Sequence, residues 1–153
     1  MSLPDFLAGR RRPNPGVPAE SVTPAGRRAV GPHLPLIRAA VAKARDRAMA
    51  LARELGIERD GLAGWCDNVS LHLSEELRAA GLDAALVLGR VRPPAGRPAV
   101  HWWVQLGGAY IDATADQFNR RFGAHPFPAL VVAMPDELPS HRATEVIRRA
   151  GPA

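Results

Sequence analysis

The chain has 153 residues, of which 46% are hydrophobic and 23% charged, and its formal net charge is +5. This length and balance are typical of one globular domain with a sizeable core. The chain contains no apolar run long enough to cross a bilayer, and its start lacks the charged-then-apolar order of a signal peptide. Cys66 is the only cysteine, which excludes an internal disulfide framework and makes a reducing cytoplasm the expected compartment.

Residues 1–33 are rich in proline, glycine and arginine and show no helical or alternating pattern of apolar residues. Such a composition does not offset the entropy of ordering a chain. We therefore expect a flexible arm or extended strap, followed by a single domain over residues 34–153. Lys43 is the only lysine, so arginine supplies almost all of the positive charge.

This arginine bias bears on the expected partners. Nucleic-acid binding through the arm would show a steep dependence on salt. A bias in genome composition explains the same charge equally well, so we do not expect nucleic acid to be the partner. Neither do we expect a membrane partner.

Two amphipathic helices are expected in the first half of the domain. Apolar residues recur at three- and four-residue spacing over 35–55, and Gly56 follows as a stop. A second apolar stripe runs over 66–80, and Gly81 stands where a C-terminal glycine cap belongs.

The second half is expected to be mainly β-structure. The predicted strands cover 84–91, 100–106, 109–113 and 129–133. Gly107-Gly108 is a strong signal for a hairpin turn between the second and third of these. Residues 143–150 are predicted to form a short terminal helix.

A tight turn at Gly107-Gly108 fixes the register of the hairpin. Side chains alternate between the two faces of a sheet, so Val100, Trp102, Val104, Leu106, Ala109, Ile111 and Ala113 share one entirely apolar face. The opposite face then carries His101 and Asp112 as diagonal neighbours, close enough for the carboxylate to bond the imidazole. The hairpin therefore predicts a His–Asp couple.

Cys66 lies at the expected start of the second helix, after the flexible Gly61 and Gly64. A thiol attacks as its thiolate, so the pKa of a nucleophilic cysteine must fall below the ordinary value near 8.5. Helix N-termini stabilise negative charge, and a His101 charged by its pairing with Asp112 would act in the same direction. Cys66, His101 and Asp112 are therefore the candidate catalytic residues.

Several short motifs occur in a characteristic order over residues 60–118. Gly64-Trp65-Cys66 opens a helix and Arg78-Ala79-Ala80-Gly81 precedes a strand; His101-Trp102-Trp103-Val104 and Tyr110-Ile111-Asp112-Ala113-Thr114 follow. Together they resemble the core of the transglutaminase-like superfamily of cysteine acyltransferases and proteases. This resemblance implies that Cys66 is the nucleophile, His101 the general base and acid, and Asp112 the residue that orients the histidine.

The chain departs from the family pattern at two positions. The family often has proline where Ala113 stands, and often alanine where Trp102 stands. Neither departure removes a catalytic atom.

We therefore expect an α+β fold with a papain- and transglutaminase-like core, in which a helix bearing Cys66 at its start packs on an antiparallel sheet carrying His101 and Asp112. The expected function is acyl transfer on a protein or peptide substrate, without a cofactor. Cys66 would attack a glutamine side-chain amide or a peptide bond, and water or an amine would resolve the thioester. The alternative is a non-catalytic protein-interaction module that retains this fold.

Three further residues are candidates for contacts with substrate or with the developing oxyanion. Backbone N–H groups around Trp65 and Cys66 would form an oxyanion hole. Trp103 shares a sheet face with His101, so it either walls the cleft or packs under the second helix. Gln117 either lines the cleft or belongs to a turn and the core.

No metal site is expected. Cys66, His101 and Asp112 lack a pair of ligands at the close spacing typical of zinc sites. The remaining histidines are interpreted as incidental: His72 falls on another side of its helix, and His33, His125 and His141 lie in proline-rich or terminal segments.

Overall fold

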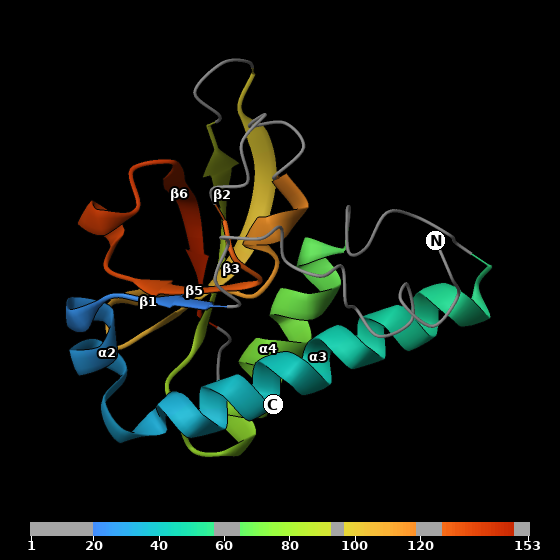
Figure 1. Ribbon diagram of the computed structural model, residues 1–153, viewed down its shortest axis with the longest axis horizontal. Helices are drawn as coiled ribbons and strands as arrows, with labels where there is room; N and C mark the ends of the chain where they lie inside the picture. Colours follow the sequence, from blue (N-terminus) through green and yellow to red (C-terminus); the bar gives the residue numbers. More distant parts are fainter. Residues whose placement is uncertain (1–19, 57–64, 93–96, 119–126, 149–153) are drawn as a thin grey trace.

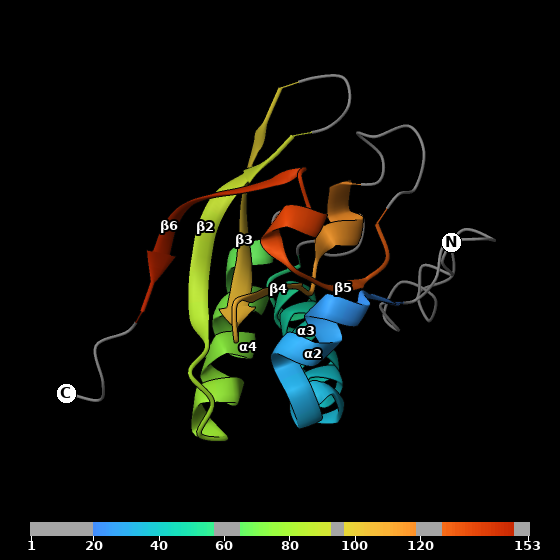
Figure 2. The same ribbon diagram turned by 90° about the vertical axis from the view of Figure 1, so that its left-hand side faces the viewer.

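The computed structural model describes residues 20–56, 65–92, 97–118 and 127–148. They form an α+β fold in which helices pack on one face of a mixed six-stranded sheet (Figures 1 and 2). None of the helices in these segments is both long and apolar enough to cross a membrane.

Residues 20–33 belong to the folded body, so the expectation of an arm over 1–33 is wrong for this part. They form strand β1 (Glu20–Val22), helix α2 (Pro24–Val30) and the short 3-10 helix η1 (Gly31–His33). Thr23 caps α2, because its Oγ1 accepts the N–H of Gly26 at 2.9 Å. The rest of the predicted arm, residues 1–19, lies outside the described residues.

The two predicted amphipathic helices are confirmed as α3 (Leu34–Glu54) and α4 (Cys66–Ala79). They pack against each other on the same side of the sheet (Figure 1). Their buried stripes include Ile37, Val41, Ala44 and Ala48 on α3 and Val69, Leu73 and Leu77 on α4. Gly81 follows α4 with a φ of 83°, a conformation that favours glycine.

The strands follow in the order β2 (Ala85–Val91), β3 (Ala99–Leu106), β4 (Ala109–Asp112), β5 (Leu130–Ala133) and β6 (His141–Ile147). Two short 3-10 helices, η2 (Ala115–Phe118) and η3 (Pro135–Glu137), lie between them in the sequence. The strand order in the sheet is β1-β5-β4-β3-β2-β6.

Two strands correct the predicted sheet. The sheet is not purely antiparallel, because β1 pairs with β5 in parallel. The predicted terminal helix over 143–150 is also wrong, because most of this segment belongs to β6, which pairs antiparallel with β2. The β-branched Thr144, Val146 and Ile147 favour a strand there, and pairing with the free edge of β2 outweighs the helical pattern.

The sheet buries a different core on each face. The helix-covered face contains Val104, Leu106, Ala109, Ile111 and Ala113, as the hairpin register predicts. The opposite face buries Val87, Val91, Trp103, Tyr110, Val131 and Ala133 against Phe127, Ala115 and Leu138. Val100 is an exception to the predicted apolar face, since 63% of it is exposed near the start of β3.

Candidate active site

The hairpin brings His101 and Asp112 together as predicted. β3 and β4 pair in the expected register, with Leu106 opposite Ala109 and Val104 opposite Ile111. The Nε2 atom of His101 lies 2.8 Å from Oδ2 of Asp112, and both side chains are fully buried. The predicted His–Asp couple is confirmed.

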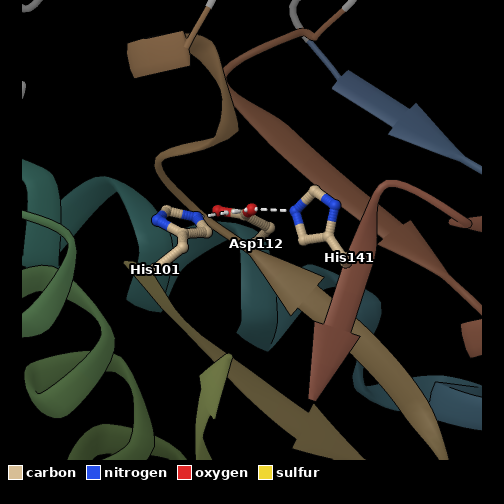
Figure 3. A group of neighbouring side chains, drawn as sticks. All are labelled: His101, Asp112 and His141. Carbon is tan, nitrogen blue, oxygen red and sulfur yellow. Dashed lines mark hydrogen bonds and ion pairs between the residues drawn. The ribbon is translucent and has the colours of Figure 1, made fainter. Parts of the chain in front are cut away.

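Asp112 accepts hydrogen bonds on both of its oxygens. Oδ1 accepts the backbone N–H of Thr114 at 3.0 Å. Oδ2, which binds His101, also lies 2.6 Å from Nε2 of His141. The carboxylate therefore lies between two imidazoles, as Figure 3 shows.

His141 is the residue of this cluster that the sequence reasoning missed, and its interpretation as incidental is wrong. It is the first residue of β6, where it pairs with Val91 of β2. Its Nδ1 atom lies 2.9 Å from Oγ of the neighbouring Ser140. The β-branched residues after His141 are the signal that would have indicated a strand and brought this histidine into the sheet.

Charge within the cluster changes the pKa of both members of the couple. Burial on its own raises the pKa of Asp112, but the charge and hydrogen bonds of His101 and His141 hold it far below its usual range. Burial lowers the pKa of His101, but Asp112 and, to a smaller extent, the Cys66 side chain outweigh it and raise this pKa to about 9. At neutral pH the pair is therefore a carboxylate and an imidazolium.

Cys66 also reaches this cluster. It is the first residue of α4, and 9% of it is exposed. Its side chain hydrogen-bonds His101 and is one of the causes of the raised pKa of that histidine. Since a carboxylate only accepts, Nε2 of His101 donates to Asp112, which leaves Nδ1 as the ring atom for the thiol.

Ser70 helps to hold Cys66 near His101. It lies one helical turn after Cys66, and its hydroxyl donates to the backbone carbonyl of Trp102 at 3.0 Å. Trp102 is the direct neighbour of His101 on β3. This bond therefore joins the start of α4 to the strand that carries the histidine.

Arg45 of α3 holds the segment that follows Asp112. Its guanidinium donates to the carbonyl of Ala113 at 2.6 Å and forms a two-pronged ion pair with Asp116, with both contacts at 3.1 Å. The Thr114 N–H that binds Asp112 lies within this segment. Arg45 thus connects the helix layer to the backbone around the carboxylate.

Trp103 packs beside the two histidines rather than under α4. It is fully buried on the opposite face, with ring centroids 5.9 Å from His101 and 5.1 Å from His141. Gly89 of β2 makes room for it, because a β-carbon at that position would clash with the Trp103 ring and the Arg142 carbonyl. Of the two predicted placements, packing under the second helix is wrong. Trp103 forms part of the wall of the histidine cluster.

The other two candidates lie on either side of the cluster in the sequence. Trp65 directly precedes α4, is half-buried and packs against the helix-side core. The backbone of Gln117 belongs to η2, and its side chain lies outside the described residues. A contact of either residue with substrate stays a prediction.

His101, Asp112 and His141 offer three possible metal ligands within 4.8 Å of one another. Two ligands on a tetrahedral zinc ion lie roughly 3.3 Å apart, given bonds of about 2.0–2.1 Å. The separations between Oδ2 of Asp112 and the two Nε2 atoms, 2.8 and 2.6 Å, are hydrogen-bond lengths instead. The three side chains therefore fit a hydrogen-bonded cluster better than a metal centre.

A pocket of about 360 Å³ lies at the other end of the hairpin, around Gly107 and Gly108. None of the cluster residues lines it. Its charged residues Asp83 and Arg148 pair with each other at 3.2 Å. We therefore assign the candidate active site to Cys66 and the histidine cluster rather than to this pocket.

Comparisons with protein family models, with curated proteins and with solved structures gave no match. The candidate site therefore rests on the geometry and chemistry of its own residues.

Proposed function

We propose that the protein is a thiol acyl-transfer enzyme that acts on amide bonds, with Cys66 as nucleophile, His101 as general base and acid, and Asp112 as the residue that orients His101. One observation carries this proposal: His101 hydrogen-bonds both Asp112 and the Cys66 thiol. A cysteine and a base in contact, with the base held by a third group, is the arrangement that activates a thiol.

The charges of the site support attack by a thiolate. With a pKa of about 9, His101 is a cation at neutral pH. A cation beside a thiol stabilises the thiolate, and the start of α4 adds the positive end of its helix dipole. Asp112 keeps its negative charge and so stabilises the imidazolium without taking up its proton.

The reaction follows in two balanced steps. The Sγ atom of Cys66 bonds to the amide carbon, and the C–N bond breaks as His101 gives its Nδ1 proton to the leaving nitrogen. This step forms a thioester and releases ammonia or an amine. Neutral His101 then takes a proton from water or an acceptor amine, which bonds to the same carbon and expels the Cys66 thiolate.

The substrate class is a protein or peptide amide, either the side chain of glutamine or a peptide bond. This follows the transglutaminase-like motif order around Cys66, His101 and Asp112, and a papain-like core is part of the same proposal. Backbone N–H groups at the start of α4 are suited to bind the developing oxyanion, because the first N–H groups of a helix lack acceptors within it. Lys43 is the only lysine, so self-cross-linking through a lysine has one possible donor.

The dependence of Cys66 alkylation on pH tests the nucleophile. The rate with iodoacetamide should change less than about threefold between pH 8 and pH 6, because an ion-paired thiolate persists at low pH. The alkylation rate of an ordinary thiol with a pKa near 8.5 falls roughly 75-fold from pH 8 to pH 6. For each protein the rate at pH 6 is divided by its own rate at pH 8, so slow access of the reagent to the nearly buried thiol affects both rates equally and drops out of the ratio.

The chain offers a matched control on the same helix. Leu71 is exposed near the middle of α4, so the double variant Cys66→Ser/Leu71→Cys moves the single thiol away from His101. This control should show the ordinary steep profile. If wild-type Cys66 shows it too, the site does not activate the thiol and the non-catalytic interaction module becomes the better explanation.

Activity itself is measured with a mixture of glutamine-containing peptides. We expect ammonia release or peptide cleavage in the wild type and none in Cys66→Ser. Mass spectrometry in the presence and absence of an added primary amine distinguishes transamidation, deamidation and peptide hydrolysis. Equal product from wild type and Cys66→Ser would contradict the proposal.

A further inference from the structure

We propose that His141 is a positioning residue of this site, which holds the Asp112 carboxylate in place for His101 by donating a second N–H to the same oxygen. The positioning of Asp112 by His141 rests on the hydrogen-bond geometry alone. Its importance for catalysis rests on the proposed function. The triad of Cys66, His101 and Asp112 thereby becomes a chain of four side chains.

The bonds around Asp112 show what His141 adds. His101 approaches Oδ2 from β3 and His141 approaches the same atom from β6, while the N–H of Thr114 binds Oδ1. Figure 3 shows the two imidazoles approaching the carboxylate from opposite sides, and together with the Thr114 N–H these donors restrict its rotation. Without His141, the carboxylate would be held only by the Thr114 N–H and by His101, the side chain that it has to orient.

His141 is itself held in a fixed orientation. Its backbone N–H donates to the carbonyl of Leu138 at 3.0 Å, and its Nδ1 atom pairs with the hydroxyl of Ser140. The ring packs edge-on against Trp103 and Phe127, with centroids 5.1 and 5.6 Å away. Because its Nε2 atom donates to Asp112, its Nδ1 atom accepts the Ser140 hydroxyl proton when the ring is neutral.

The position of His141 indicates an indirect role. Figure 3 places the two imidazoles on opposite sides of Asp112, and their ring centroids are 5.8 Å apart. The bonds described for the His141 ring nitrogens go to Asp112 and Ser140, and its route to the Cys66 thiol passes through Asp112 and His101. His141 therefore acts on the reaction by fixing Asp112.

A second consequence concerns the charge of Asp112. Among the described residues, the charges of His101 from β3 and His141 from β6 act on this carboxylate. Cys66 of α4 lies beyond His101, and Arg45 of α3 is neutralised by Asp116 of η2. Removing the His141 donor leaves a buried anion with one bond fewer. Asp112 then takes up a proton at higher pH, and His101 loses its anionic partner there.

Two substitutions at position 141 separate positioning from packing. His141→Gln keeps an amide N–H at about the reach of Nε2, whereas His141→Leu keeps apolar bulk and removes the donor. His33→Leu is the control, because His33 lies on η1 and belongs to the distant pocket rather than to this cluster.

Proton NMR reads the positioning directly. Buried imidazole N–H groups bonded to a carboxylate give far-downfield resonances, so the wild type should show one from His101 and one from His141. His141→Gln should lose only its own resonance, and His141→Leu should also broaden or shift that of His101. His33→Leu should leave both unchanged.

The pH dependence of Cys66 alkylation shows how the loss of His141 affects the reactivity of the thiol. We call the pH below which Cys66 alkylation slows its acid limit. In His141→Leu this acid limit should rise by about one to two pH units, the effect of losing one hydrogen bond to a charged group. His141→Gln should restore the wild-type limit to within about half a unit. A role in packing alone predicts equal effects of Gln and Leu.

Each result decides the proposal. An unchanged His101 resonance and acid limit in folded His141→Leu would overturn it, as would a His141→Gln protein that loses the His101 resonance. If His141→Leu does not fold, the Gln variant alone decides. Cobalt absorption bands that require His141 would assign the cluster to a metal and also overturn it. An ordinary thiol profile in the wild type contradicts the proposed function, but loss of the His101 resonance in His141→Leu would still support positioning.

Discussion

Two consecutive residues of β4, Ile111 and Asp112, are both fully buried, but they lie on opposite faces of the sheet and in opposite chemical surroundings. Ile111 belongs to the apolar core under the helices, with Val104 opposite it. Asp112 lies on the other face between two histidines. One hairpin therefore divides stability and chemistry between its two faces.

The two faces differ in what their burial costs. Moving an apolar side chain out of water is favourable, about 25 cal/mol per Å² of apolar surface. Moving a carboxylate out of water is unfavourable by several kcal/mol unless donors replace the water. Three donors do so for Asp112, which indicates that this face is specialised for the cluster. Substitutions on the two faces should therefore have separable effects.

The largest expected effect is on thiol reactivity and comes from the polar face. In Asp112→Asn the side chain keeps its shape but loses its charge, so burial lowers the pKa of His101 without the opposing anion. We expect Cys66 alkylation near pH 6 to fall by about 100- to 300-fold, to the rate set by the thiolate fraction of an ordinary thiol. An unchanged rate in the folded variant would show that Asp112 has no part in activating the thiol.

The matched change on the apolar face is Ile111→Ala. It removes three buried carbons next to Val104 and should lower the free energy of unfolding by about 2–5 kcal/mol in urea denaturation. The pH profile of Cys66 alkylation in the folded protein should match the wild type. A steeper or displaced profile would show that the two faces are coupled.

The pH dependence of stability should come from the polar face as well. The folded pKa of His101, about 9, lies above the unfolded value near 6.5. The contribution of His101 to the free energy of unfolding is therefore complete below about pH 6.5 and is lost as the pH rises through about 9. The folded pKa of Asp112 is lowered from the unfolded value near 4. The contribution of Asp112 to the free energy of unfolding is therefore present above about pH 4 and is lost as the pH falls below that value.

Urea denaturation at pH 7 and pH 9.5 measures the contribution of His101 to the free energy of unfolding. We expect a loss of about 2 kcal/mol in the wild type and in Ile111→Ala, and a much smaller loss in Asp112→Asn. Equal losses in all three proteins would mean that other groups titrate in this range.

The smallest expected effect tests the link between the helix layer and the strand of His101. Ser70→Ala removes the bond to the Trp102 carbonyl and should cost about 1 kcal/mol of stability. Since this bond lies one turn after Cys66, alkylation near pH 6 should also slow by about two- to threefold. Ser74→Ala is the control, because its hydroxyl bonds only within α4, to the carbonyl of Leu71. An equal effect of both variants on alkylation would show that Ser70 does not position the thiol.

Local patterns account for the elements that the sequence predicted well. The Gly107-Gly108 turn and the alternation around it fix the register that joins His101 to Asp112, because a slip of one residue would expose the apolar face. Helical spacing and the Gly81 cap likewise predict α4 and the place of Cys66 at its start. These features depend on residues that are close together in the chain.

The sequence by itself determined the α+β class, the two main helices, the hairpin and the His–Asp couple, since each follows from short-range periodicity and turn chemistry. The contact of Cys66 with His101 came from the family resemblance rather than from any pattern in the chain. Only the tertiary structure decided that His141 joins Asp112, that Arg45 of α3 holds the segment after it, and that residues 20–22 add a parallel strand. These contacts join segments 29 to 110 residues apart, and which segments meet depends on how the whole sheet orders its strands.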